Sequence, residues 1–448
     1  MQSNSLFTFQ DYFLVPIYLF IIFFIGYLIQ NRNIKKYPDY KYFIYGLLFK
    51  IIGVVAFISI YLFYYDGGDT INYFYGAKSL GNLLLQNKVK GFHILFNTNS
   101  NLNSFLSFNT ITTFPPLYMW SDQHTFSVCR FTAPLYLISS KSFIITSFLT
   151  ACFSYVGIWK LYRLFNNLYP KNSKAFAYLI LFLPTLIFWG GGIMKDSYVL
   201  GATCWITYNF FKIFILRKQL FVNSIFLVIN LFMIINIKSY VIISLIPGML
   251  LWLNSAYLKN ISSSLAKFFL FPVVLLGVVF AGIFLFNNLS SMMGVYGNVD
   301  SAIQQAQVIQ QDLLREEQYG GNNYKLGEID GSVIGLITVA PVAIFTALFR
   351  PLFWEIGSPT MVLSVLENTT MIIFTIVILI RTSPIKLIRI LWSEPFLLYC
   401  FIFSVLFAFG VGIAGTNFGA LVRYKTPLVP FFFSMIYLVF KKSSNHNV

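Results

Sequence analysis

Charge is what this sequence lacks most. Of its 448 residues, 10% are charged and 57% are hydrophobic, whereas a soluble chain of this size carries roughly 25% charged residues. Apolar stretches recur from end to end and leave no room for a large soluble domain. The sequence therefore predicts an all-α, polytopic transmembrane helical bundle that forms a single integral-membrane domain over residues 1–448.

Three further absences narrow the possibilities. The four cysteines show neither a paired framework nor metal-type spacing. No basic residue precedes Arg32, so the N-terminus lacks the charged start of a cleavable signal peptide, and we expect the first span to be retained. No convincing internal repeat is present, although transporters often show one. The net charge of +16 lies mostly in loops between spans, which predicts membrane topology rather than a nucleic-acid partner.

The apolar segments predict about 11 spans plus one shorter, re-entrant segment. The predicted spans are Tyr12–Gln30, Phe43–Tyr65, Leu135–Trp159, Ala175–Trp189, Tyr198–Leu216, Phe221–Ile235, Tyr240–Leu253, Phe268–Phe286, Met361–Ile380, Phe396–Gly412 and Leu428–Phe440. The shorter segment, Val333–Leu348, contains Pro341, and its length and its proline favour a re-entrant helix over a full span.

Basic residues set the expected sidedness. If Val333–Leu348 does not cross, the loops that carry Lys36, Arg217 and Lys386 all fall on one side of the membrane. The positive-inside rule assigns that side to the cytoplasm. The N-terminus is then outside and the C-terminus is cytoplasmic, and nearly all carboxylates face outward.

The two longest outer loops cover approximately residues 66–134 and 287–332. The first opens with Asp66-Gly67-Gly68-Asp69, directly after the apolar segment Phe43–Tyr65, so paired acids sit at the membrane surface on a backbone free to turn sharply. The apolar spacing of Ile71–Leu85 then predicts a helix that lies in the membrane interface.

Shorter outer loops collect further charges at membrane depth. These residues are Lys195 and Asp196 after the glycines Gly190–Gly192, Lys238, Arg350 and Glu355, and Arg423 and Lys425. Ions at membrane depth are costly unless they are paired or functional. Helix capping and mutual ion pairing explain such residues without any function. A helix N-terminus beside Lys195 is also a candidate phosphate site.

The layout resembles the GT-C superfamily of integral-membrane glycosyltransferases. The matching features are the acidic motif Asp66–Asp69 directly after a span, the interfacial helix next to it, and the late Arg423-Tyr424-Lys425 followed by Pro427 on the same face. The chain departs from the family pattern in an extra span before the acidic loop. The resemblance implies transfer of a sugar from a polyprenyl-phosphate-linked donor to a glycan, lipid or protein acceptor on the extracytoplasmic face, and we expect a bacterial inner (plasma) membrane.

The residues fit that chemistry. Asp69 is the predicted general base for the acceptor hydroxyl, and Asp66 is its neighbour, acting through like-charge repulsion or a shared divalent metal. The predicted substrate-binding residues are Lys195, Asp196, Lys238, Arg350, Glu355, Arg423 and Lys425. Two alternatives stay open: an O-antigen-type polysaccharide polymerase or ligase, and a transporter or scaffold subunit of an envelope complex.

Overall fold

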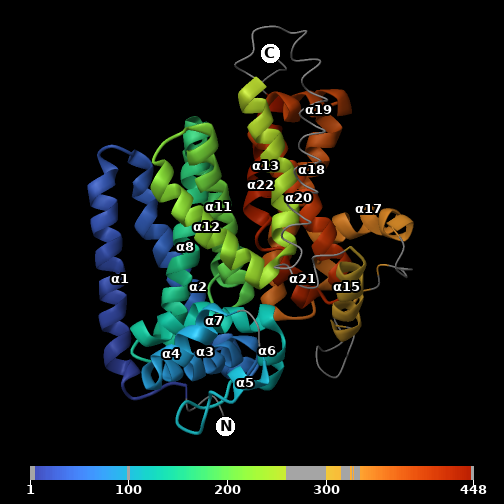
Figure 1. Cartoon of the computed structure of the whole chain (residues 1–448). Coiled ribbons are helices and arrows are strands. Elements are labelled where there is room, and N and C mark those ends of the chain that lie inside the picture. The colour runs from blue at the N-terminus through green and yellow to red at the C-terminus, as the bar shows by residue number, and fades with distance from the viewer. Residues whose placement is uncertain are drawn as a thin grey trace. The chain divides into compact units, whose positions relative to one another are not determined.

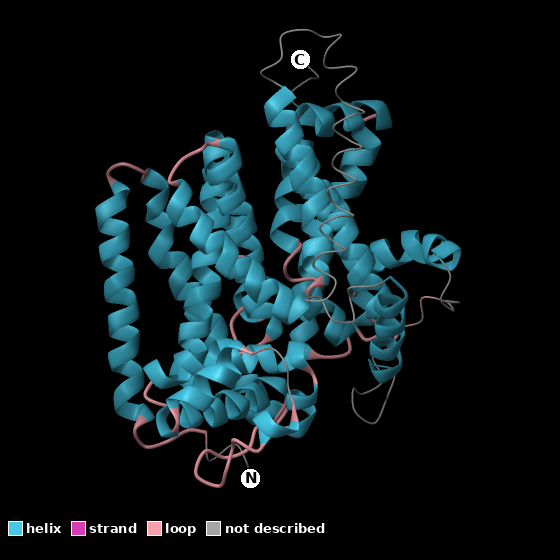
Figure 2. Cartoon of the chain, in the orientation of Figure 1, coloured by secondary structure: helices cyan, strands magenta, loops and turns pink. Residues whose placement is uncertain are grey.

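The computed structural model describes residues 6–97, 101–258, 299–313, 323–324, 326 and 333–444. The chain folds as two compact units, which are considered separately below. Unit 1 comprises Met1–Tyr208 and Val228–Lys238, and unit 2 comprises Asn209–Leu227 and Ser239–Val448. Throughout the described ranges the chain is helix and connecting loop with no strand (Figures 1 and 2), which confirms the all-α prediction.

Within the described residues, seven helices are long and apolar enough to cross a membrane, as a polytopic membrane protein requires. They are α1 (Asp11–Ile34), α2 with its π-helical end η3 (Phe43–Ser59 and Ile60–Tyr64), α8 (Phe143–Leu168), α12 (Leu220–Lys238), α13 (Tyr240–Leu258), α18 (Pro359–Arg381) and α20 (Pro395–Ala414). The apolar surface of α1 is largely uncovered by protein, for example at Phe13, Phe20 and Phe24. Such a surface suits contact with lipid rather than water.

The remaining helices of unit 1 are shorter. They are η2 (Pro38–Tyr42), α3 (Asp69–Gln86), α4 (Lys88–Phe96), α5 (Leu102–Phe105), α6 (Leu117–Ser121), α7 (Gln123–Ile138), η4 (Pro170–Asn172), α9 (Ser173–Phe176), η5 (Ala177–Leu181), α10 (Pro184–Phe188) and the start of α11 (Lys195–Phe210). In Figure 1, α3 and α4 lie across one end of the long helices α1, α2 and α8.

The helix predicted over Ile71–Leu85 exists as α3, but its apolar face is covered by protein. Ile71, Phe74 and Leu80 are buried, and α3 packs closely along α7. Gly81 permits this approach, because a Cβ atom there would overlap the ring of Tyr136 on α7. Helix α3 therefore presents its apolar side to α7 rather than to the membrane interface.

The neighbouring helix α4 does expose apolar side chains. Val89, Phe92 and Phe96 are exposed, whereas Gly91 and Ile94 face the protein. The exposed residues follow helical spacing, as expected of a helix with one face in a membrane interface.

Two predicted spans are broken by turns, and two others, Tyr198–Leu216 and Leu428–Phe440, fall on helices that are not among the seven. The segment Leu135–Trp159 is broken, because α7 ends at Ile138 and α8 begins only at Phe143. Between them, Ser140 and Lys141 adopt left-handed backbone angles, which an α-helix cannot contain. The Ser142 hydroxyl then accepts a hydrogen bond from the backbone N–H of Ile145 and caps α8.

The predicted span Ala175–Trp189 is also interrupted. The structure divides it into α9, η5 and α10. Pro184 begins α10; it has no backbone N–H, and it restricts the residue before it to extended backbone, here Leu183 with ψ of 124°. Hydrophobicity alone did not reveal this break.

Unit 2 is built around α13, α20 and α22 (Val429–Ser444). Its further helices are η6 (Phe211–Ile215), α15 (Val299–Leu313), α17 (Val333–Phe349), η8 (Phe353–Glu355), α19 (Pro384–Ser393) and α21 (Phe418–Tyr424). Aromatic rings fill its core: Tyr399 lies 5.5 Å from Trp252, and Phe403 lies 4.9 Å from Phe431, measured between ring centroids. The predicted span Phe268–Phe286 lies outside the described residues.

Helix α17 corresponds to the segment predicted to be re-entrant. Its 17 residues rise about 26 Å, less than the ~30 Å of a hydrocarbon core. It packs against α20, where a Cβ atom at Gly412 would overlap the carbonyl of Ala343. Figure 1 shows α17 running transverse to α20.

Candidate functional site

The acidic turn is a tight left-handed connection between η3 and α3. Asp66, Gly67 and Gly68 have φ angles of 45°, 156° and 107°. A side chain at Gly68 would be strained by this backbone and would lie 3.0 Å from the ring of Tyr61. The turn places Asp69 as the first residue of α3, the end of a helix at which acidic side chains are stabilising.

The charge of Asp69 acts on a tyrosine and a lysine from distant parts of unit 1. Burial, reinforced by the negative charge of Asp69, raises the pKa of Tyr118 to about 12, although a hydrogen bond with Asn72 opposes the shift. The same Asp69 charge stabilises the ammonium form of Lys195. The fold therefore brings the acidic turn into electrostatic contact with the start of α11.

Close packing of the glycine loop positions Lys195. A Cβ atom at Gly192 would overlap the ring of Phe57 on α2, so the loop lies directly against that helix. The Ser197 hydroxyl donates to the Gly192 carbonyl at 2.7 Å and ties the loop to α11. The absence of a side chain at Gly192 thus lets this loop lie against α2.

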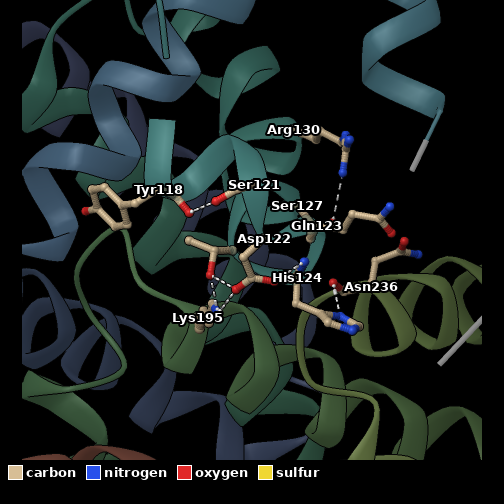
Figure 3. Close-up of polar contacts among 10 residues, drawn as sticks. Tyr118, Ser121, Asp122, Gln123, His124, Ser127, Arg130, Lys195 and Asn236 are labelled. Atoms are coloured by element: carbon tan, nitrogen blue, oxygen red, sulfur yellow. Dashed lines mark hydrogen bonds and ion pairs between the residues drawn. The ribbon is translucent and has the colours of Figure 1, made fainter. Parts of the chain in front are cut away.

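Lys195 meets the N-terminus of α7 (Figure 3). Its Nζ donates to the Thr125 hydroxyl at 2.7 Å and lies 3.6 Å from Oδ2 of Asp122. The Thr125 hydroxyl in turn donates to the Asp122 carboxylate. Asp122 also caps α7 by accepting the backbone N–H of His124 at 3.0 Å. Lys195 is thus held by a carboxylate and a hydroxyl one helical turn apart.

Burial and neighbouring charges both shift the pKa values of Lys195 and Asp122. Burial lowers the pKa of Lys195, and the neighbouring Lys238 lowers it further, while Asp122 and Asp69 partly restore it. For Asp122, burial disfavours the carboxylate, but Lys195, Thr125 and His124 together hold the pKa of its carboxyl below the usual value. Lys195 is 23% exposed and Asp122 is 48% exposed, so a ligand can reach both.

A second ion pair lies deeper in unit 1. Lys238, the last residue of α12, donates to Oδ1 of Asp196 at 2.7 Å, and the two side chains are 8% and 1% exposed. Close by in the chain, the Asn236 carbonyl lies 3.0 Å from Nδ1 of His124 (Figure 3). The end of α12 is therefore joined to both α11 and α7.

Sequence reasoning missed Asp122 and Thr125. The available signal was local: an Asp followed by a helix start, just after the rigid Pro115-Pro116, indicates an N-cap. Nothing in the sequence shows that this cap faces Lys195, because the contact is made only when α7 and α11 pack together.

The predicted residues of unit 2 form a separate cluster. Arg350 Nε donates to the Glu355 carboxylate at 2.9 and 3.2 Å. Its guanidinium also lies over the rings of Tyr324 and Phe418, at 5.0 and 4.8 Å from their centroids. These contacts fix the planar guanidinium on both its edge and its faces.

Lys425 lies beneath this pair and is 1% exposed. Its Nζ donates to the Arg350 carbonyl at 2.8 Å and to Oδ1 of Asn368 at 2.7 Å. Burial lowers the pKa of Lys425 to about 7, although the charge of Glu367 opposes the shift. Arg423, two residues earlier on α21, is partly exposed.

The described residues contain no group of three or more His, Cys, Asp or Glu side chains that could hold a metal ion. The structure brings together Asp69, Lys195, Asp196 and Lys238 in unit 1, near Asp66, and Arg350, Glu355 and Lys425 in unit 2, near Arg423. No family model, curated protein or solved structure matches the chain.

Proposed function

We propose that the protein is a membrane glycosyltransferase that moves a sugar from a polyprenyl-phosphate-linked donor to an acceptor hydroxyl. One observation carries the proposal: at the start of α11, Lys195 is held by the Thr125 hydroxyl at 2.7 Å and lies 3.6 Å from the Asp122 carboxylate, yet 23% of its side chain is exposed to a ligand. The negative charge of Asp69, at the start of α3, also acts on this ammonium. A carboxylate base and a phosphate-binding cation are the two groups that such a transfer needs. Both lie next to helix N-termini at the end of apolar segments.

In the proposed reaction, Asp69 accepts the proton of the acceptor hydroxyl as its oxygen bonds to the anomeric carbon. The bond between that carbon and the donor phosphate oxygen breaks, and the phosphate leaves with the electron pair. Lys195 stabilises the negative charge that develops on the leaving phosphate. Asp66 shapes the turn that presents Asp69.

Asp122 and Thr125 keep Lys195 extended before the donor binds. Their contacts at 3.6 and 2.7 Å hold the long side chain in one position, which reduces the entropy lost on binding. A donor phosphate competes with Asp122 for the ammonium. The Asp196–Lys238 pair, fully inside the protein, supports the start of α11 from the other side.

Arg350 and Lys425 are held by Glu355 and Asn368, which supports a role in keeping α21 in place. Arg423 is partly exposed on α21 and opens the late basic motif Arg423-Tyr424-Lys425, so we assign it a phosphate-binding role.

We also propose that the acidic turn faces the outside of a bacterial inner membrane. The support is the distribution of lysine and arginine in the loops, which puts the N-terminus outside and the C-terminus in the cytoplasm. Polyprenyl-phosphate donors reside in such a membrane and fit an active site at its surface.

The deciding experiment uses the purified protein in lipid vesicles with a panel of polyprenyl-phosphate sugars and measures sugar transfer. Asp69→Asn preserves the shape and removes the basic oxygen, so turnover should fall by ~100- to ~10,000-fold while donor binding persists. Asp66→Asn is the matched control and should lose less. Near-wild-type turnover in Asp69→Asn would show that Asp69 only begins α3, and would favour the polymerase, ligase or transporter alternatives.

A further inference from the structure

A pocket of about 330 Å³ lies in unit 2, beside Tyr424 at the end of α21. It is formed by α15 and the end of α21, which lie side by side in Figure 1. Its lining residues are Gln305, Val308, Ile309, Gln311, Asp312, Leu313 and Tyr424. Its volume falls within the ~300–1,000 Å³ typical of small-molecule sites.

The two walls of the pocket are fastened to one another. The Thr416 hydroxyl donates to the Gln310 carbonyl of α15 at 3.1 Å. The Thr416 carbonyl accepts the backbone N–H of Tyr324 at 2.7 Å. Asn417 then caps α21, which ends at Tyr424. Because these contacts join α15 to the segment that begins α21, the pocket has a built geometry.

The lining has the chemistry of a sugar site. Gln305 and Gln311 each offer a planar amide with both donors and an acceptor, and Asp312 offers two acceptor oxygens. Neighbouring hydroxyls of a sugar ring need this mixture of donors and acceptors. The ring of Tyr424 and the side chains of Val308 and Ile309 add apolar surface for the C–H face of a sugar.

The same lining disfavours an anionic ligand. None of the described residues that line the pocket is a lysine, arginine or histidine. A phosphate group or an anionic lipid headgroup is instead recognised by cations and helix N-termini, and the Asp312 carboxylate would repel it. The pocket therefore suits a neutral, polyhydroxylated ligand.

We propose that this pocket binds a sugar unit of a neutral glycan. The further assignment of the pocket to a glycan acceptor rests on the proposed function. Its basis is that Tyr424 directly follows Arg423, the proposed phosphate ligand of unit 2. Sugar binding itself does not depend on the transfer reaction, so the two proposals can fail separately.

Sugar binding is tested on the full-length protein in nanodiscs, since the headgroup of a maltoside detergent would compete for the pocket. The probes are maltose, cellobiose, lactose and N,N′-diacetylchitobiose, and the measurement is saturation-transfer NMR with titration of the signal. At least one disaccharide should bind the wild type. Gln305→Ala and Tyr424→Ala should each weaken that binding by about 10-fold, as expected for one lost hydrogen-bonding group or stacking ring.

Gln304→Ala is the matched control, because Gln304 is exposed on the same helix and does not line the pocket. It should bind like the wild type. Tyr424→Phe should also bind well, since it keeps the ring, and it guards against a mere folding defect in Tyr424→Ala. Three outcomes would overturn the proposal. The first is that none of the four disaccharides binds, and the second is that Gln304→Ala loses as much binding as Gln305→Ala. The third is that inorganic phosphate displaces the sugar.

Asp69→Asn separates the two proposals. If the disaccharides bind but Asp69→Asn transfers sugar normally, the glycosyltransferase mechanism is wrong and the sugar pocket stands. If Asp69→Asn is inactive but no disaccharide binds to the wild type, the pocket assignment is wrong and the catalytic assignment stands.

Discussion

Lys238 Nζ lies 2.7 Å from Oδ1 of Asp196, and both side chains are almost completely inaccessible. This pair joins the end of α12 to the first turn of α11, which carries Lys195 at its first position. Neither charge is tolerable alone at such a depth. The pair therefore makes the position of the candidate site depend on a residue that we do not expect to touch the reacting atoms.

The first prediction concerns this pair. Lys238→Met leaves the Asp196 carboxylate buried without its cation and should destabilise the protein by about 3–5 kcal/mol. The double variant Lys238→Met/Asp196→Leu removes both charges and should recover most of the loss. Thermal unfolding in one detergent measures the effect. A double variant no more stable than Lys238→Met would mean that the two residues do not stabilise the fold as a pair.

The same pair shows where sequence reasoning stops. The adjacent Lys195 and Asp196 suggest a local ion pair, but neighbours in a helix do not face one another. The partner of Asp196 is instead Lys238 and the partner of Lys195 is Asp122. Both partners come from other helices, and only tertiary packing selects them.

Local sequence signals predicted where helices and turns lie better than they predicted which residues make contact. The acidic turn and the start of α3 could be predicted, because Gly67 and Gly68 supply the positive φ angles that the turn needs. The break at Ser139–Ser142 was missed although a local signal was present, because four consecutive polar residues that include Lys141 interrupt the apolar segment there. The apolar face of α3 was predicted, but the choice between lipid and α7 as its cover depends on the packing of the whole unit.

The second prediction concerns Lys425 and pH. Its pKa is about 7 in the folded protein and near 10.4 in an unfolded chain. Between these values the unfolded state binds more protons, so this residue's contribution to stability rises with pH, by at most about 1.4 kcal/mol per pH unit. The difference in Tm between wild type and Lys425→Met should therefore widen from pH 7 to pH 9.

Lys35→Met provides the control for Lys425, because Lys35 is exposed and its removal should leave the pH dependence of Tm unchanged. Lys425→Met also leaves the Arg350 carbonyl and the Asn368 amide oxygen without their donor, so it should unfold at a lower temperature at every pH. A constant Tm difference across this pH range would contradict the lowered pKa.

The third prediction concerns Arg423. Arg423→Ala should raise the KM for a polyprenyl-phosphate donor by about 10- to 100-fold, because a charge-assisted contact with phosphate is lost. Arg423→Lys should recover only part of the affinity, since lysine cannot make a bidentate contact. Initial rates at varied donor concentration give both parameters. Arg381→Ala, at an exposed position at the end of α18, should behave like the wild type.

The fourth prediction concerns sidedness. The test positions are Lys36, Lys88 and Arg389, which are all exposed. Each is changed to cysteine in turn, in a protein whose native cysteines have been replaced. A membrane-impermeant maleimide applied to intact cells should label Lys88→Cys, and should label Lys36→Cys and Arg389→Cys only after the membrane is permeabilised. Labelling of Arg389→Cys from outside would show that α17 crosses the membrane and that the predicted orientation of the C-terminal half is wrong.

The last prediction concerns Lys195 and the pH dependence of transfer. The ammonium form is needed to bind the donor phosphate, and it is lost as the pH rises through the pKa of Lys195. Burial lowers that pKa, so kcat/KM for the donor should begin to fall at a lower pH than an ordinary lysine would allow. Arginine stays charged throughout this range, so Lys195→Arg should retain its kcat/KM at alkaline pH. Lys88→Arg, at an exposed lysine of α4, should keep the wild-type profile. Because kcat/KM reports groups of the free enzyme, an alkaline decline in Lys195→Arg identical to that of the wild type would assign the titration to another residue and remove Lys195 from phosphate binding.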